Sequence, residues 1–224
     1  IPGIVVIGFF GITYYNFALN YGQVVVPAAT ASFLISSAPI WIALLAMPLF
    51  KERLRPWGWA GIVLSFGGVA TIALGNAGAL NFAPRALVVL SAALSTSIYS
   101  LGQKQYVARY GALPSTAYAI WAGALLMLPF GGGLLEELRA APLDATAAVI
   151  YIGLVPGAMG YATWSYVLGQ MPASRAGSFL YLIPVLALVI GWVWLGEAPT
   201  LVSVVGGLLV LAGVVMVNRS RSLT

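Results

Sequence analysis

Eight apolar segments in series constrain the fold of this chain more than any other feature. They cover residues 2–20, 28–50, 57–76, 86–108, 114–132, 146–168, 174–195 and 199–217. An α-helix needs about 20 apolar residues to cross the hydrocarbon of a bilayer, and the alternating pattern of a membrane β-barrel is absent. Only 7% of the residues are charged, against roughly 25% in a soluble domain. We therefore expect an all-α polytopic membrane protein with eight transmembrane helices in a lipid bilayer.

The residue types that are missing exclude several functions. The chain contains no cysteine and no histidine, so we expect no disulfide, no metal site, no cofactor and little from which to build an enzyme's catalytic group. Ten Lys and Arg residues outnumber five Asp and Glu residues, but such a surplus is usual for loops that face an anionic membrane surface. Nucleic acid is therefore not an expected partner, and the sequence makes no prediction of oligomeric state.

The positive charges are distributed unevenly between the two faces that the eight segments define. One face carries Lys51, Arg53, Arg55, Lys104, Arg109, Arg175, Arg219 and Arg221. The other carries Arg85 and Arg139, together with the acidic residues Glu136, Glu137 and Asp144. By the positive-inside rule the first face is cytoplasmic, so we expect both chain ends in the cytoplasm.

A second constraint is an internal repeat with an offset of 145 residues. Pro27, Pro39, Glu52, Gly61 and Gly68 return without a gap as Pro172, Pro184, Glu197, Gly206 and Gly213. The second copy comes five segments after the first, and because five is odd, the two copies must lie inverted in the membrane. We expect residues 1–78 to hold the last three helices of a first five-helix unit, 84–218 to form a second unit, and 219–224 to be a cytoplasmic tail. An eight-helix protein in its own right remains the alternative.

Short motifs around both copies resemble one transporter family. The first copy has Ala18-Leu19 with Tyr21, Pro27-Ala28, Ser37-Ala38-Pro39-Ile40, Lys51-Glu52-Arg53 and Gly61-Ile62; the second has Trp164 with Leu168, Pro172-Ala173, Ile183-Pro184-Val185, Gly196-Glu197 and Gly206-Gly207. Their order, spacing and duplication resemble the EamA-type drug/metabolite transporter superfamily, and within it the YddG-type exporters of amino acids and related metabolites. The resemblance implies ten helices in two inverted five-helix halves, with the first two lacking here, and a place in the cytoplasmic (inner) membrane.

Polar side chains within the apolar segments are candidates for a substrate site, because such groups are costly in lipid and should face protein or water. Ser95, Tyr99 and Gln103 recur at every fourth position and therefore share one helix face. The candidate substrate-binding residues are Tyr15, Asn16, Ser36, Ser95, Tyr99, Gln103, Tyr161, Trp164, Ser178 and Tyr181. Helix packing is the alternative for each of them taken singly.

Three of the prolines within the segments are expected to bend them. Pro39 and Pro184 are repeat partners, and a proline removes a backbone donor from the helix. Pro156 is the third, and its flanking glycines, Gly153 and Gly157, are expected to form a face for close helix packing. We expect these bends to line the cavity and act as hinges; the alternative is that each proline simply shapes a packed helix.

The acidic residues bear on the mechanism. None lies in the middle of a segment, whereas proton-coupled pumps usually need an intramembrane carboxylate or histidine. Glu52 and Glu197 follow segment ends, where we expect each to stabilise the N-terminus of the next helix. The leading prediction is a secondary transporter that exports amino acids or related small metabolites by alternating access, uncoupled or facilitative. The alternatives are an exporter of drugs or hydrophobic cations, for which a buried carboxylate would be expected, and a non-transport membrane scaffold.

Overall fold

The structure, a computed structural model that describes residues 2–77, 85–196 and 198–220, is built from helices over that part of the chain. Eight helical spans are long and apolar enough to cross a membrane, which confirms the predicted number. They are Pro2–Gln23, Thr30–Phe50, Pro56–Leu74, Ala86–Tyr110, Ala112–Phe130, Leu143–Gln170, Ala173–Trp194 and Leu201–Arg219. Their ends differ from the predicted ends by only a few residues. Pro84, Glu197 and residues 221–224 lie outside the described residues, so the expectations for them stay predictions.

Several spans consist of more than one regular segment. The elements are α1 (Pro2–Gly8), η1 (Phe9–Tyr14), α2 (Tyr15–Gln23), α3 (Ala28–Ile35), α4 (Ala38–Phe50), α5 (Pro56–Ala77), α6 (Ala86–Tyr110), α7 (Ala112–Met127), η2 (Leu128–Phe130), α8 (Leu134–Ala140), α9 (Leu143–Ile152), η3 (Gly153–Met159), α10 (Gly160–Gln170), α11 (Ala173–Ser178), η4 (Phe179–Tyr181), α12 (Leu182–Leu195) and α13 (Leu201–Arg219). The short helix α8 was not predicted. Glu136 and Glu137 lie in its first turn, where negative charge is favourable.

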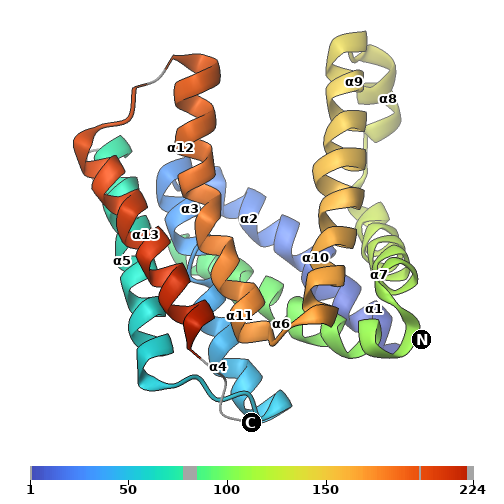
Figure 1. Cartoon of the computed structure of the whole chain (residues 1–224). Coiled ribbons are helices and arrows are strands. Elements are labelled where there is room, and N and C mark those ends of the chain that lie inside the picture. The colour runs from blue at the N-terminus through green and yellow to red at the C-terminus, as the bar shows by residue number, and fades with distance from the viewer. Residues whose placement is uncertain (1, 78–84, 197, 221–224) are drawn as a thin grey trace.

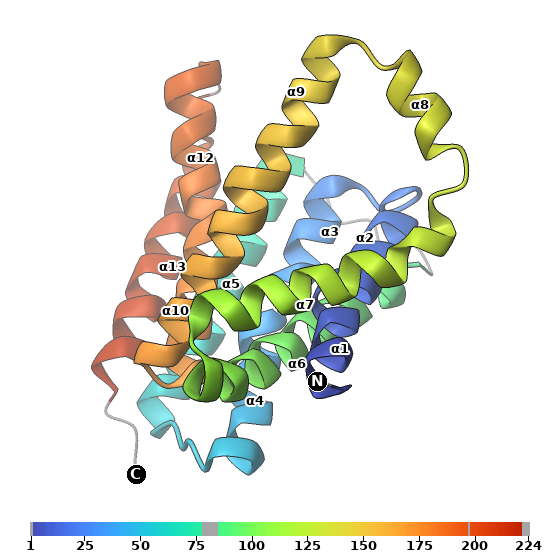
Figure 2. The ribbon, with the colours of Figure 1, turned by 90° about the vertical axis from the view of Figure 1, so that its right-hand side faces the viewer.

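Helix α6 is the centre of the molecule. In its most apolar window 56% of the residues are buried, a larger share than in any other span, and it packs against α2, α3, α4, α7 and α10. Figure 2 shows α7 lying beside α1 and α6. By contrast, α9 and η3 contain no buried residue.

The repeat is visible in the contact between α5 and α13. A Cβ placed on Gly68 would lie 2.6 Å from the carbonyl oxygen of Gly206, and Gly61 approaches Gly213 equally closely. Glycines permit such contact between membrane helices. Between these two contacts, Ser65 donates a hydrogen bond of 3.3 Å to the carbonyl of the residue 145 positions later, its own repeat partner. The two helices therefore run antiparallel and exchange equivalent positions, as inverted copies related by a two-fold axis do.

The helices that precede the repeated glutamates end in the same backbone conformation. Lys51 follows α4 with φ +57°, and its repeat partner Gly196 follows α12 with φ +71°. A left-handed conformation suits glycine but strains a residue that has a Cβ. The first repeat thus carries backbone strain at Lys51 that the second repeat avoids.

Two further irregularities occupy equivalent positions in the repeats. The π-helical segments η1 and η3 coincide in the 145-residue register, and such segments are frequent at functional sites. The spans that contain Pro39 and Pro184 are also interrupted, between α3 and α4 and between α11 and α12. Each proline lies in the first turn of the following helix, where a missing N–H is tolerated. A hinge role for either proline stays a prediction.

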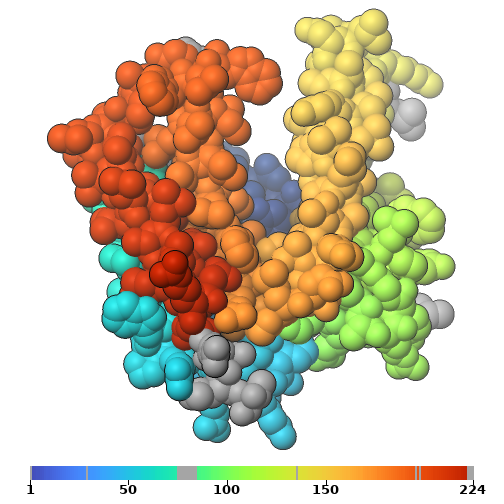
Figure 3. All heavy atoms as spheres, in the orientation of Figure 1, coloured from blue at the N-terminus to red at the C-terminus, as the bar shows by residue number. Residues whose placement is uncertain are grey.

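A hollow lies between α12 on one side and α9, η3 and α10 on the other, as Figure 3 shows. It opens toward the end of the molecule where α9 begins and α12 ends, which we call the open end (Figure 1). At the other end, the closed end, α4, α6, α10 and α11 meet in a buried apolar cluster, which we call the basal cluster. It consists of Ile42, Ala46, Leu101, Leu168, Ala173 and Ala176.

Candidate functional site

A pocket of about 260 Å³ lies between the two π-helical segments. It is lined by Ile12, Asn16, Ile120, Gly153, Gly157, Ala158 and Tyr161. Ile12 and Gly157 are repeat partners at the 145-residue offset, and so are Asn16 and Tyr161. A pocket that contains both members of two repeat pairs lies where the inverted repeats meet. We call it the axial pocket.

Side chains from three helices donate hydrogen bonds to the backbone of η1. Ser95 of α6 donates to the Phe10 carbonyl at 2.6 Å, Tyr161 of α10 to the Gly11 carbonyl at 3.2 Å, and Asn16 to the Ile12 carbonyl at 2.7 Å. Three successive carbonyl groups thus each accept a hydrogen bond from a side chain. These hydrogen bonds stabilise an irregular helix segment, because an unpaired backbone group is costly inside a membrane.

Two tyrosines pack around this segment. The rings of Tyr99 and Tyr161 lie edge to face, with centroids 5.6 Å apart. Any Cβ at position 11 would overlap the Tyr99 ring, so glycine is required there. Tyr99 is 1% exposed, and its role in the structure is to pack against η1.

Gln103, the third member of the predicted polar face of α6, lies in a separate buried network. Its Nε2 lies within hydrogen-bond distance of three hydroxyl groups, those of Ser115 at 3.2 Å, Thr116 at 3.0 Å and Ser165 at 3.0 Å, and its two N–H groups can donate to two of them at a time. Trp164 lies close by, and its indole N–H donates to Ser100 at 3.2 Å. These contacts join α6, α7 and α10. They are of the kind expected if the residues serve helix packing, the alternative to substrate binding.

Four further predicted site residues also lie apart from the axial pocket's lining. Tyr15 begins α2 and is partly buried, while Ser36 bonds the Ser32 carbonyl within its own turn. Ser178 is fully buried and accepts a hydrogen bond from Asn218 of α13. Tyr181 is fully buried in an apolar cluster formed by α5 and α13. Of the ten candidates, Asn16 and Tyr161 line the axial pocket. Ser95 does not line it but donates a hydrogen bond to η1, which borders it.

The prediction for Gly153 and Gly157 was wrong. Among the described residues, no atom of a neighbouring helix lies within 4 Å of a Cβ placed on either glycine. Instead of packing against a helix, both line the axial pocket. Pro156 lies between them within η3, where its missing N–H interrupts the regular hydrogen-bond ladder.

The prediction for Glu52 was correct about the kind of contact and wrong about the helix. The carboxylate does stabilise a helix N-terminus, but that of α11 in the other repeat: it accepts from the N–H groups of Ala173 at 2.9 Å and Ser174 at 3.0 Å. Burial alone raises the pKa of this carboxyl, but the hydrogen bonds from Ser174, Ala173 and Lys104 outweigh burial and hold the pKa below its ordinary value. Glu52 is therefore ionised at neutral pH.

Charge is absent from the lining of the axial pocket. Over the described residues, no group of three or more acidic side chains is placed to hold a metal ion. The pocket offers the phenol of Tyr161, the amide of Asn16 and apolar surface. This arrangement suits a small molecule without net charge.

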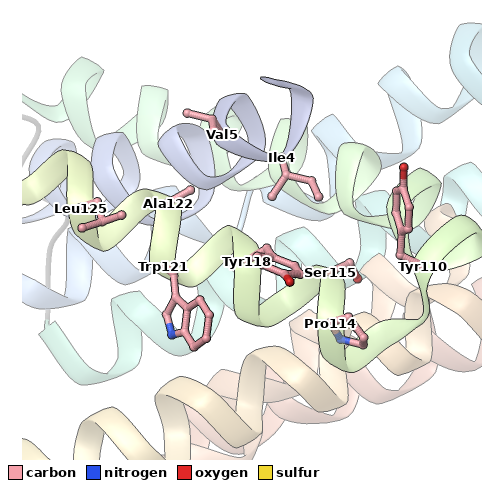
Figure 4. A pocket seen from close by; sticks show the side chains of 9 residues that line it. All are labelled: Ile4, Val5, Tyr110, Pro114, Ser115, Tyr118, Trp121, Ala122 and Leu125. Carbon is pink, nitrogen blue, oxygen red and sulfur yellow. The ribbon is translucent and has the colours of Figure 1, made fainter. Parts of the chain in front are cut away.

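A larger groove of about 550 Å³ lies between α1 and α7 (Figure 4). All of its lining residues come from α1, α7 and the end of α6. Its aromatic side chains Tyr118 and Trp121 are exposed on the outer surface of α7. A groove on an outer, apolar surface is expected to contact lipid, so we assign the candidate site to the axial pocket.

Sequence reasoning missed the residues of the site that carry no polar side chain. Ile12, Gly157, Ala158 and Ile120 line the axial pocket, and Gly11 holds the Tyr99 ring. Polarity within a span does not mark apolar residues. Extending the 145-residue register to the first span would have paired Ile12 with Gly157 and Asn16 with Tyr161.

Comparison with known proteins agrees with this architecture. Residues 1–74 and 84–219 match the EamA-like transporter family. An uncharacterized transporter of Bacillus subtilis, YdfC, is 41% identical over 214 residues, which are 96% of this chain and 70% of the relative. A probable terminal-alkyne amino-acid exporter of Streptantibioticus cattleyicolor is 39% identical over 219 residues, covering 98% of this chain and 73% of its own.

Two more distant matches extend the comparison. A probable amino-acid metabolite efflux pump of Salmonella typhimurium is 24% identical over 206 residues, covering 88% of this chain and 68% of its own. A solved crystal structure matches 95% of this chain and 75% of its own with a TM-score of 0.79 at 23% identity, which shows a shared fold. With its eight apolar spans and its repeat, the chain is a membrane transporter that belongs to the EamA-like transporter family.

Proposed function

We propose that the protein exports amino acids or related small metabolites across the cytoplasmic membrane by alternating access. The observation that carries the proposal is the axial pocket, which is uncharged and lies between the π-helical segments of two inverted repeats. Secondary transporters built from inverted repeats hold their substrate at the repeat interface, where irregular helices line the site. Two relatives named for amino-acid or metabolite export support the substrate class.

The proposed transport is uncoupled from a proton gradient. The described acidic residues, Glu52, Glu136, Glu137 and Asp144, all lie outside the eight spans or at their ends. A proton-coupled carrier usually needs an ionisable group within the membrane. The absence of a carboxylate from the axial pocket also favours a neutral or zwitterionic substrate over a hydrophobic cation.

The proposed orientation places the closed end in the cytoplasm. Lys51, Arg53, Arg55, Arg109 and Arg219 lie at or just beyond helix ends on that side. Cytoplasmic loops carry such an excess of positive charge. The open end then faces outward, so the conformation is one from which an exported molecule is released.

Efflux from proteoliposomes tests this function. The full-length protein is reconstituted with labelled neutral amino acids inside, and efflux is followed with and without a proton gradient. We expect efflux in both conditions and at the same rate. A rate that depends on the gradient would contradict uncoupled transport, and no efflux of any amino acid from folded protein would contradict the substrate class.

Substitutions in the axial pocket link transport to this site. Tyr161→Phe removes the hydroxyl that bonds η1, and we expect efflux to fall about threefold to tenfold, the effect of one hydrogen bond. Gly157→Leu fills the pocket and should abolish efflux. Tyr166→Phe is the matched control, because Tyr166 lies on the same helix but is 60% exposed. Equal efflux from Gly157→Leu and the unaltered protein would exclude the axial pocket as the substrate site.

A further inference from the structure

Glu52 forms the one ion pair among the described residues, and it does so at the closed end. Lys104 of α6 donates to its Oε1 at 3.0 Å. The other oxygen, Oε2, accepts from the N–H and the hydroxyl of Ser174, at 3.0 and 2.9 Å. Together with the bond from the Ala173 N–H, these contacts form what we call the Glu52 cluster.

Both charged side chains of the cluster are largely withdrawn from solvent. The Glu52 side chain is 11% exposed and that of Lys104 20%. Lys104 also donates to the Met171 carbonyl at 2.8 Å, between α10 and α11. Both hydrogen bonds of this ammonium group therefore go to residues outside α6.

The cluster joins α4 and α6 to the short connection between α10 and α11. At this end α4 packs against α6, α10 packs against α6, and α11 packs against α4. Glu52 follows α4 and contacts α6 and α11, and the basal cluster lies directly beside it, since Ala173 belongs to both. At the closed end, the apolar basal cluster therefore lies beside the polar Glu52 cluster.

We propose that the Glu52 cluster is the gate that keeps the closed end shut and that it must break in each transport cycle. The inference rests on the proposed alternating access. For the hollow to open at this end, α10 and α11 must separate from α4 and α6, and this motion removes the contacts of Glu52 with α11 and the contact of Lys104 with Met171. Because both groups lie at the membrane boundary, water replaces those contacts when the gate opens. A charged contact at this place is therefore strong when closed and still reversible.

Thiol accessibility tests the gate without requiring any substrate. The chain has no cysteine, so one introduced thiol is the sole reporter. Ala46→Cys places it in the basal cluster, at a position with 0% exposure. The protein is held in nanodiscs and treated with a membrane-impermeant maleimide. We expect Glu52→Gln to raise the labelling rate about tenfold, because loss of one partner of a mostly buried pair favours the separated state.

Two further variants provide a control and a second test for this measurement. Arg53→Gln removes a charge from the neighbouring, exposed position and should leave the labelling rate unchanged. Lys104→Met removes the other partner and should act like Glu52→Gln. Equal labelling of Glu52→Gln, Lys104→Met and the unaltered background in folded protein would overturn the proposal.

A cross-link tests separation directly and is independent of the first readout. Glu52→Cys with Ser174→Cys replaces two contacting side chains, and a short bifunctional thiosulfonate joins them. We expect cross-linking to stop efflux and a reductant to restore it, while each single variant is insensitive to the reagent. Full efflux from completely cross-linked protein would show that the gate need not open. If no variant transports anything, the proposed substrate is wrong, but the labelling result still decides the gate.

Discussion

The two repeats build the same irregular helix from different residues. In η1 the distortion accompanies three hydrogen bonds from side chains to successive carbonyl groups, with the Tyr99 ring against Gly11. In η3 the repeat partner of Gly11 is Pro156, whose missing N–H interrupts the helix within its own sequence. One segment depends on its neighbours and the other on its local chemistry. The equivalent backbone shape, rather than equivalent side chains, is what the repeats share at the axial pocket.

The same contrast extends along both helices. Gly8 packs against α7, whereas its repeat partner Gly153 lines the axial pocket without a neighbouring helix within 4 Å of its Cβ position, over the residues described. Similarly, Lys51 adopts with strain the backbone conformation that Gly196 adopts without it. Inverted repeats therefore predict where a structural feature recurs, but not which residues produce it.

The first prediction concerns the packing difference between Gly8 and Gly153. A Cβ on Gly8 would lie 2.5 Å from the Ala119 carbonyl oxygen and 3.1 Å from the Gly123 nitrogen, both backbone atoms. We expect Gly8→Ala to lower the free energy of unfolding by about 1–3 kcal/mol through overpacking. Gly153→Ala should leave stability unchanged or raise it slightly. Thermal unfolding of the detergent-solubilised protein measures both, and equal melting temperatures would show that α1 and α7 are less tightly packed than the contact indicates.

A smaller effect is expected at the side chains that hold η1. Ser95→Ala removes the side-chain hydrogen bond to the Phe10 carbonyl inside the membrane, and we expect a loss of about 1 kcal/mol. Thr146→Ala in α9 is the control, because its bond to the Pro142 carbonyl is exposed. Chemical denaturation compares the two variants. If Thr146→Ala is as destabilising as Ser95→Ala, the idea that η1 depends on its neighbours more than the second repeat does would fail.

The smallest expected effect concerns the left-handed residues. Lys51→Gly relieves the strain at φ +57°, and we expect a gain of up to about 1 kcal/mol. Gly196→Ala should lose a similar amount. Opposite changes in the melting temperatures of the two variants would show that backbone strain distinguishes the two repeats at this position. A loss in both variants would mean that the Lys51 side chain contributes more than its backbone costs.

Much of the fold follows from local features of the sequence. Apolar length predicted eight spans because the bilayer sets the length of a helix, and the odd number of spans between copies predicted the inversion now seen in the contact of Gly61 with Gly213 and Gly68 with Gly206. The site was less predictable. Polarity singled out Asn16 and Tyr161, but also Gln103, Ser178 and Tyr181, which are buried in helix packing. A polar side chain within a span needs a partner, and the sequence does not show whether that partner is protein or substrate.

By itself, then, the sequence determined the membrane location, the number of spans, the inverted repeat and the family, because each depends on residue type and spacing along the chain. Only the tertiary structure decided which polar groups line the axial pocket, that Gly153 and Gly157 face it, and that Glu52 binds the N-terminus of α11 rather than the helix after it. These outcomes depend on which helix faces are brought together across 100 residues or more. Hydrogen bonds between distant segments are selected by that packing, which no local pattern encodes.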